Sequence, residues 1–223
     1  MKIEFLNKNV LVVGASKGIG KQICNTFKSL GACIYRISRE DGIDISNKED
    51  IDIFFKTINS LDIVINVAAI NYCKSIEEIS YEEWESVLAT NLTSYFYIIK
   101  KALPMMKTGS KIVNVSSIAG RNKSIVSGAH YTSSKAGIIG LTRQLAHELG
   151  PRGINVNCVC PSQTLTPMLQ NSMTLDEQKS LANNIPLRRL ATVEDQVGPV
   201  LFLCSSLAEY VNGAIIDVNG GQL

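Results

Sequence analysis

The sequence of 223 residues lacks a strong charge of either sign. Its 22 basic and 20 acidic residues give a formal net charge of +2, and the lysines and arginines form no cluster. Proteins that bind nucleic acid usually carry a basic patch or stripe on one face. We therefore do not expect nucleic acid as a partner.

Long hydrophobic runs are also missing. No apolar stretch approaches the roughly 20 residues that a membrane-spanning helix needs. The N-terminus, MKIEFLNKNVLVVG, has an acidic residue at position 4 and does not follow the layout of a signal peptide. We therefore expect no membrane partner.

Cysteine is present, but not in a spacing that is typical of metal sites. No Cys-x-x-Cys pair occurs, and the two histidines complete no zinc pattern. Most of the cysteines stand in apolar runs, where a free thiol packs as a small hydrophobic group. We predict reduced thiols, no metal site and a cytoplasmic protein. The six residues are Cys24, Cys33, Cys73, Cys158, Cys160 and Cys204.

Repeats, low-complexity tracts and linkers are absent as well, so we predict a single domain over residues 1–223.

Short β-branched runs alternate with longer helical patterns, which predicts an α/β fold with a doubly wound parallel sheet. The predicted strands cover 9–13, 32–37, 43–45, 62–67, 111–116, 154–159 and 214–218. The predicted helices cover about 18–30, 47–59, 81–101, 130–149 and 193–206.

One interval departs from this alternation. Residues 36–44, RISREDGID, leave no room for a full helix between the second and third strands. A parallel crossover normally contains a helix. Either a loop makes this crossover or the third strand is vestigial. We favour the loop, with the helix shortened or missing.

A glycine-rich turn follows the first strand directly. It reads Gly14-Ala-Ser-Lys-Gly18-Ile-Gly20, and a helical pattern comes next. Glycines at a strand-to-helix turn let the backbone approach a pyrophosphate, and the helix N-terminus offers free N–H groups. Ser16 and Lys17 can add phosphate contacts. A structural turn is the plain alternative, but the position in the first strand–helix unit favours nucleotide binding.

The end of the second strand bears on the choice of nucleotide. An acidic residue there would hold the ribose hydroxyls of NAD, whereas an arginine accommodates the 2′-phosphate of NADP. Ser38 and Arg39 occupy this place, and they favour NADP(H). Glu40 and Asp41 follow immediately, so NAD(H) and plain loop charge stay open as alternatives.

The stretch GAHYTSSKAGIIG places Tyr131 four residues before Lys135. Such pairs are neighbours on a helix face, and many are ordinary surface pairs. A lysine ammonium close to a phenol also lowers the pKa of the phenol and so makes an acid/base pair. The residues around the pair are small, which leaves space for ligands.

Several segments together resemble the short-chain dehydrogenase/reductase family, nearest to members that reduce 3-oxoacyl groups on a carrier protein. They are GASKGIG, DIVINVAA, TNLTS, KIVNVSSIAG, YTSSK, RGINVNCVCPSQTLTPM and VNGAIIDVNGG, and they span nearly the whole chain. The resemblance implies a Rossmann-type sheet of seven strands in the order 3-2-1-4-5-6-7.

The resemblance also implies a catalytic tetrad. Tyr131 would be the acid/base, and Lys135 would lower its pKa and bind the nicotinamide ribose. Ser117 would polarise the substrate carbonyl, with Ser116 as the near competitor. Asn91 would hold a water that relays protons and would lie beside the cofactor. The further implied cofactor contacts are Ile19, Asp44, Ile45, Asn66, Val67, Ala68, Pro161, Thr164 and Thr166.

These observations predict an NADP(H)-dependent oxidoreductase that interconverts a carbonyl and a secondary alcohol, with 3-oxoacyl thioesters as one substrate class. A reductase or dehydrogenase of sugar nucleotides or other small metabolites, using NAD(H), is the alternative. A non-catalytic NADP sensor or scaffold is the alternative of a different class. The resemblance further implies a homotetramer, and we expect residues 162–190 to form a lid over the substrate.

Overall fold

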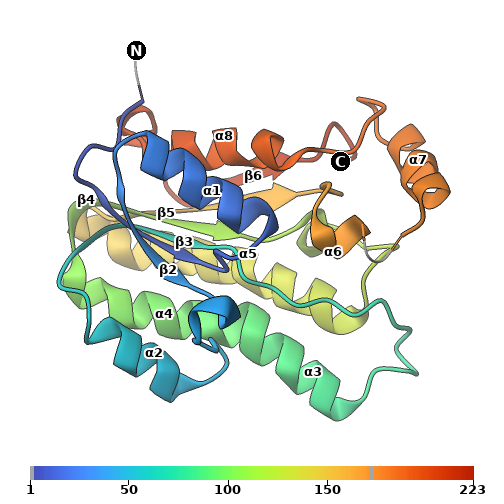
Figure 1. The fold of residues 1–223 in the computed structure, drawn as a ribbon, viewed down its shortest axis with the longest axis horizontal. Coiled ribbons are helices and arrows are strands. Elements are labelled where there is room, and N and C mark those ends of the chain that lie inside the picture. Colours follow the sequence, from blue (N-terminus) through green and yellow to red (C-terminus); the bar gives the residue numbers. More distant parts are fainter. Residues whose placement is uncertain (1–2, 171–172) are drawn as a thin grey trace.

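A computed structural model of the chain describes residues 3–170 and 173–223. Its centre is a six-stranded sheet in the order β2-β1-β3-β4-β5-β6, in which every neighbouring pair is parallel (Figure 1). The strands are β1 (Asn9–Val13), β2 (Cys33–Ile37), β3 (Leu61–Asn66), β4 (Met106–Val115), β5 (Asn155–Pro161) and β6 (Ile215–Val218).

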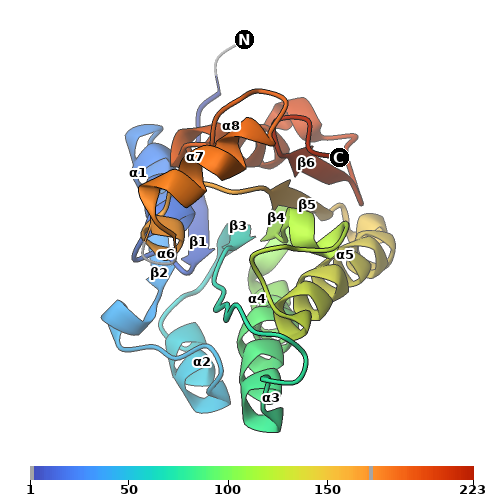
Figure 2. The same ribbon diagram turned by 90° about the vertical axis from the view of Figure 1, so that its right-hand side faces the viewer.

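Helices cover both faces of the sheet (Figure 2). α1 and α8 pack side by side on one face, and α2, α4 and α5 lie on the other. The helices are α1 (Gly18–Ser29), α2 (Lys48–Phe55), α3 (Tyr81–Leu88), α4 (Ser94–Ala102), α5 (Ala129–Leu149), α6 (Pro167–Gln170), α7 (Leu175–Asn183) and α8 (Val193–Cys204). None in the described ranges is long and apolar enough to cross a bilayer.

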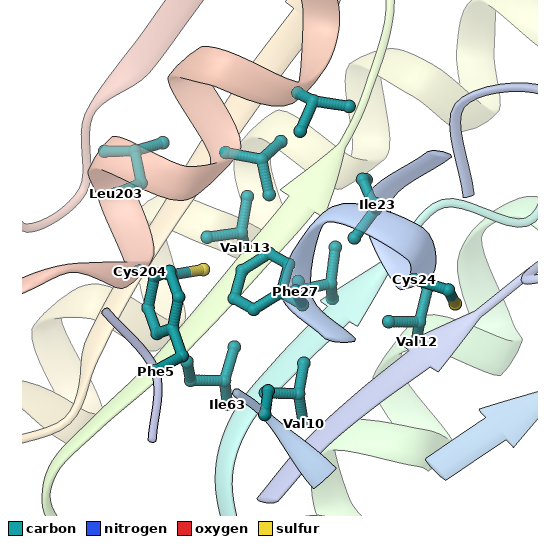
Figure 3. Packing of buried hydrophobic residues seen from close by; sticks show 14 of the residues in the cluster. Phe5, Val10, Val12, Ile23, Cys24, Phe27, Ile63, Val113, Leu203 and Cys204 are labelled. Carbon is teal, nitrogen blue, oxygen red and sulfur yellow. The ribbon is translucent and has the colours of Figure 1, made fainter. Parts of the chain in front are cut away.

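The central strands are apolar on both sides because each side meets a helical layer. In β1, Val10 and Val12 point to the α1 and α8 layer, and Leu11 and Val13 point to the other. Figure 3 shows the first layer, where Phe27 of α1 packs against Phe5 with ring centroids 4.5 Å apart. This two-sided core fixes the strand ends that carry the glycine turn and the predicted catalytic groups.

The doubly wound parallel sheet is confirmed, but the prediction of seven strands is wrong, because residues 43–45 form no strand. Ser38 caps a short 3-10 turn at Arg39–Asp41, and β2 becomes the edge of the sheet. The amide of Asp44 donates to Asp50, and the Asp44 carboxylate accepts from the amide of Ser46. Local contacts therefore occupy the amides of this segment, including that of Ile43, which donates to the Ser38 carbonyl, and α2 forms the crossover to β3.

The predicted helix over 81–101 is divided into α3, a π-helical turn at Ala89–Thr93, and α4. The predicted lid, residues 162–190, contains α6 and α7, which lie beyond the carboxyl ends of the strands (Figure 1). Residues 171 and 172 of that segment lie outside the described part of the chain.

Candidate active site

A cleft of about 560 Å³ opens at the carboxyl ends of the strands. It lies where the chain order reverses between β1 and β3, the place where open parallel sheets bind ligands. Most of the predicted site residues line it: Gly14, Ser16, Lys17, Gly18, Ile19, Gly20, Ser38, Arg39, Ile45, Val67, Ala68, Ser117, Tyr131, Lys135, Pro161, Thr164 and Thr166.

Three predicted residues do not line the cleft. Asn66 is fully buried and donates its side-chain amide to Asn114. The carboxylate of Asp44 accepts from Ser46. Asn91 lies in the π-helical turn and holds the backbone of Ile70 through both its amide oxygen and its amide nitrogen, each at 2.9 Å. Of the three, Asn91 supports the cleft wall from behind, because Ile70 lines the cleft.

The glycine turn is packed so tightly that Gly14 and Gly20 have no room for a side chain. A Cβ on Gly20 would fall 2.1 Å from the carbonyl oxygen of Gly14, and one on Gly14 would fall 2.6 Å from the amide of Ala68. Lys17 precedes α1 without a side-chain cap, and the first turn of α1 has no acidic residue. The helix thus presents free N–H groups to the cleft, which suits the pyrophosphate of a dinucleotide.

The two candidate serines have different roles in the structure. Ser116 is buried, and its hydroxyl donates to the carbonyl oxygen of Lys135 at 2.6 Å. Both serines line the cleft, but it is the hydroxyl of Ser117 whose hydrogen bond with Tyr131 lowers the pKa of that phenol. The geometry therefore leaves Ser117 as the hydroxyl that can meet a ligand beside Tyr131.

Tyr131 and Lys135 lie one turn apart on α5, with the ammonium nitrogen 5.6 Å from the centroid of the Tyr131 ring. Burial raises the pKa of Tyr131, and the hydrogen bond with Ser117 opposes this effect. The structure thus differs from the expectation of a lowered phenol pKa, because burial outweighs the other effects on Tyr131. The ammonium of Lys135 donates to the carbonyl of Val115 at 2.9 Å. Burial also lowers the pKa of Lys135 to about 8.

Sequence reasoning missed Tyr95, which lies one turn after Asn91 and is fully buried. Its hydroxyl donates to the carbonyl of Ala68 at 3.0 Å, in the loop that follows β3. The only sequence signal is the spacing of four residues from Asn91, which puts both side chains on one face of a helix.

The remaining walls come from three loops and are largely apolar. Ile118 and Val126 lie on one side, and Leu169 and Met173 come from the segment predicted as a lid. Tyr72, in the loop after β3, is a further wall residue that the sequence did not indicate. Among residues 3–170 and 173–223, no group of three or more histidine, cysteine or acidic side chains could hold a metal ion.

Comparisons with known proteins identify similar sequences and structures. A family profile described as enoyl-(acyl carrier protein) reductase matches residues 41–222. The 3-oxoacyl-(acyl-carrier-protein) reductase FabG of Aquifex aeolicus is 34% identical and covers 100% of both chains. A short-chain dehydrogenase/reductase structure from Brucella melitensis, described as glucose/ribitol dehydrogenase, has a TM-score of 0.92 at 30% identity and covers 100% of this chain and 99% of its own. A short-chain dehydrogenase from Leptospira borgpetersenii with bound NAD+ has a TM-score of 0.89 at 28% identity, with coverage of 98% and 94%.

Proposed function

Because the chain belongs to the short-chain dehydrogenase/reductase family and is an oxidoreductase, we propose that it interconverts a carbonyl and a secondary alcohol with NADP(H). The observation that carries the proposal is that Ser117, Tyr131 and Lys135 line the same cleft as the glycine turn. We do not pursue the alternative of a non-catalytic sensor or scaffold, because the relatives that define the family are dehydrogenases and reductases.

The cofactor would lie with its phosphates at the glycine turn, which is folded so tightly that a Cβ on Gly14 or Gly20 would collide with backbone atoms of the chain itself. The nicotinamide of the bound cofactor would supply the hydride. The hydroxyl of Ser117 donates to the substrate carbonyl oxygen and so polarises it. The phenol of Tyr131 then gives its proton to the oxygen that becomes the alcohol, and Lys135 stabilises the phenolate that remains. The predicted water relay at Asn91 stays a prediction.

The choice between NADP and NAD depends on two neighbouring residues of the cleft wall. The side chain of Arg39 is 66% exposed and forms a long ion pair of 3.7 Å with Asp44, so it is free to turn towards a 2′-phosphate. Asp41 is engaged by Ser38 and Arg36. Glu40 also lines the cleft and is the observation that favours NAD.

We expect Arg39→Ala to raise the Kd for NADPH by about 10- to 100-fold, because charge-assisted hydrogen bonds to the 2′-phosphate are lost. NADH should bind almost unchanged. Fluorescence titration with both cofactors measures this, and Glu40→Ala is the matched variant. Equal losses for the two cofactors in Arg39→Ala, or a loss confined to NADH in Glu40→Ala, would contradict the preference for NADP.

For the substrate we propose a 3-oxoacyl thioester. Apolar walls at Ile118, Val126, Leu169 and Met173 suit an acyl chain, and the relative from Aquifex aeolicus is named for this reaction. A sugar or polyol is the second candidate, because Ser124, Ser127 and Gln163 also line the cleft and the Brucella melitensis structure is described as a glucose/ribitol dehydrogenase.

A substrate panel tests the proposed function. We expect the kcat/KM for reduction of 3-oxoacyl thioesters of pantetheine by NADPH to exceed the kcat/KM for aldoses and polyols, whether these are oxidised or reduced. Turnover of sugars with no turnover of thioesters would favour the second candidate. The absence of turnover with every carbonyl and alcohol of the panel would contradict both.

We also propose that the chain forms a homotetramer and that residues 162–190 close over the substrate. In support of assembly, Phe96 of α4 is 49% exposed, and Ala136 and Gly140 lie on the exposed side of α5. Small side chains let two helices approach closely. Light scattering at micromolar concentration should therefore give the mass of four chains, and Ala136→Arg should lower it. A monodisperse wild-type monomer would contradict the assembly.

A further inference from the structure

Tyr95 joins two loops of the cleft from below. It is fully buried on α4, and its hydroxyl lies 3.0 Å from the carbonyl oxygen of Ala68 and 3.4 Å from that of Val115. Ala68 follows β3, and Val115 ends β4 just before Ser117. One phenol therefore fixes the loop beside the glycine turn relative to the strand that carries the serine.

The ring of Tyr95 also faces Lys135. The ammonium nitrogen lies 5.6 Å from the centroid of the Tyr95 ring and 5.6 Å from that of Tyr131, so two aromatic rings flank it. It donates to the carbonyl of Val115, the same oxygen that Tyr95 approaches. Lys135 is 1% exposed and is held by a carbonyl dipole and two rings.

The other groups that act on Lys135 are two thiols, and both raise its pKa. Cys158 and Cys160 project from β5 towards α5 and are fully buried together with Tyr95. No carboxylate is among the titratable groups that face the ammonium from α4, α5 and β5 in the described residues. A buried cation without an acidic partner depends on the groups beside it, here the Val115 carbonyl and the two aromatic faces.

We propose that Tyr95 is a positioning residue for the reaction: its ring keeps Lys135 charged and in place, and its hydroxyl fixes the Ala68 loop. The inference rests on the proposed function, in which Lys135 must be an ammonium to stabilise the Tyr131 phenolate.

The direction in which loss of the Tyr95 ring should shift the pH profile follows from the surroundings of Lys135 and Tyr131. Burial lowers the pKa of Lys135 to about 8 and raises that of Tyr131, so Lys135 is the first of the pair to lose its proton as the pH rises. The high-pH limb of reductase activity then reports the loss of the ammonium. Removing the Tyr95 ring favours the neutral amine and moves this limb to lower pH.

The test compares Tyr95→Phe, which keeps the ring, with Tyr95→Leu, which removes it. In the pH profile of kcat/KM for reduction, Tyr95→Leu should shift the high-pH limb downwards by about half to one pH unit. Tyr95→Phe should keep the wild-type limb and raise the cofactor Kd several-fold, because the Ala68 carbonyl loses its donor. Tyr95→Met replaces the leucine variant if the latter does not fold.

The proposal would be overturned if the high-pH limb of the kcat/KM profile were the same in all variants. It would also be overturned if Tyr95→Phe and Tyr95→Leu shifted this limb equally. The titration can also be followed without turnover, by NMR of 13C-labelled lysine with Lys135→Met for assignment. If Tyr95→Leu lowers the pKa of Lys135 but the wild-type protein reduces no carbonyl, the proposed function is refuted. The role of the Tyr95 ring would still stand.

Discussion

Tyr131→Phe should lower kcat for carbonyl reduction by about 10²- to 10⁴-fold, the usual contribution of a positioned general acid. The substitution removes one oxygen and keeps the ring that flanks Lys135. The oxygen formed on the substrate then lacks a proton donor, and Ser117 loses its hydrogen-bond partner. Steady-state kinetics, with cofactor Kd measured by fluorescence, separates the chemical step from binding.

Tyr72→Phe is the matched control, because Tyr72 also lines the cleft and is 41% exposed. We expect it to retain nearly wild-type kcat and an unchanged cofactor Kd. Activity of Tyr131→Phe equal to that of this control would remove Tyr131 from the mechanism.

Gly20→Ala should weaken cofactor binding by about 100-fold and lower the free energy of unfolding by about 1–3 kcal/mol. The added Cβ would fall 2.1 Å from the carbonyl oxygen of Gly14, and backbone atoms cannot give way as the end of a side chain can. The first turn of α1 must therefore move away from β1, and its N–H groups lose their positions at the phosphate site. Titration with NADPH and thermal unfolding measure the two effects.

Gly198→Ala provides the control for this substitution. Gly198 lies within α8, is exposed, and an added Cβ would meet no atom of another segment within 4 Å. Alanine there should leave cofactor binding unchanged and change the free energy of unfolding by less than about 1 kcal/mol, because its better helix propensity is opposed by Pro199, which disfavours a helical Cβ-bearing residue before it. If both variants bound NADPH as the wild type does, the glycine turn would not be the phosphate site.

The sequence predicted the sheet and most of the cleft because those features depend on local patterns. The β-branched run at Asn9–Val13 and the glycines at 14, 18 and 20 determine a strand, a turn and a helix with little help from distant residues. The spacing of Tyr131 and Lys135 puts both on one side of α5.

Other features depend on contacts that no local pattern contains. Residues 43–45 were predicted as a strand, yet the amide of Ile43 donates to the Ser38 carbonyl and that of Asp44 to the Asp50 carboxylate, so neither pairs with the sheet. The roles of Ser116 and Ser117 separate only when α5 packs against β4 and brings the Lys135 carbonyl to Ser116. Tyr95 stands in an ordinary helical pattern, and its importance comes from the two loops that it meets.

The most direct test of the account follows the hydride itself. NADPH carrying deuterium at C4 of the nicotinamide, incubated with the enzyme and a 3-oxoacyl thioester, should give a 3-hydroxyacyl product with deuterium on the carbinol carbon, from one face of the nicotinamide only. Tyr131→Phe should give almost no labelled product in the same time. A product without deuterium at that carbon, or equal labelling by Tyr131→Phe, would contradict the central claim that this cleft transfers a hydride to a carbonyl with Tyr131 as the proton donor.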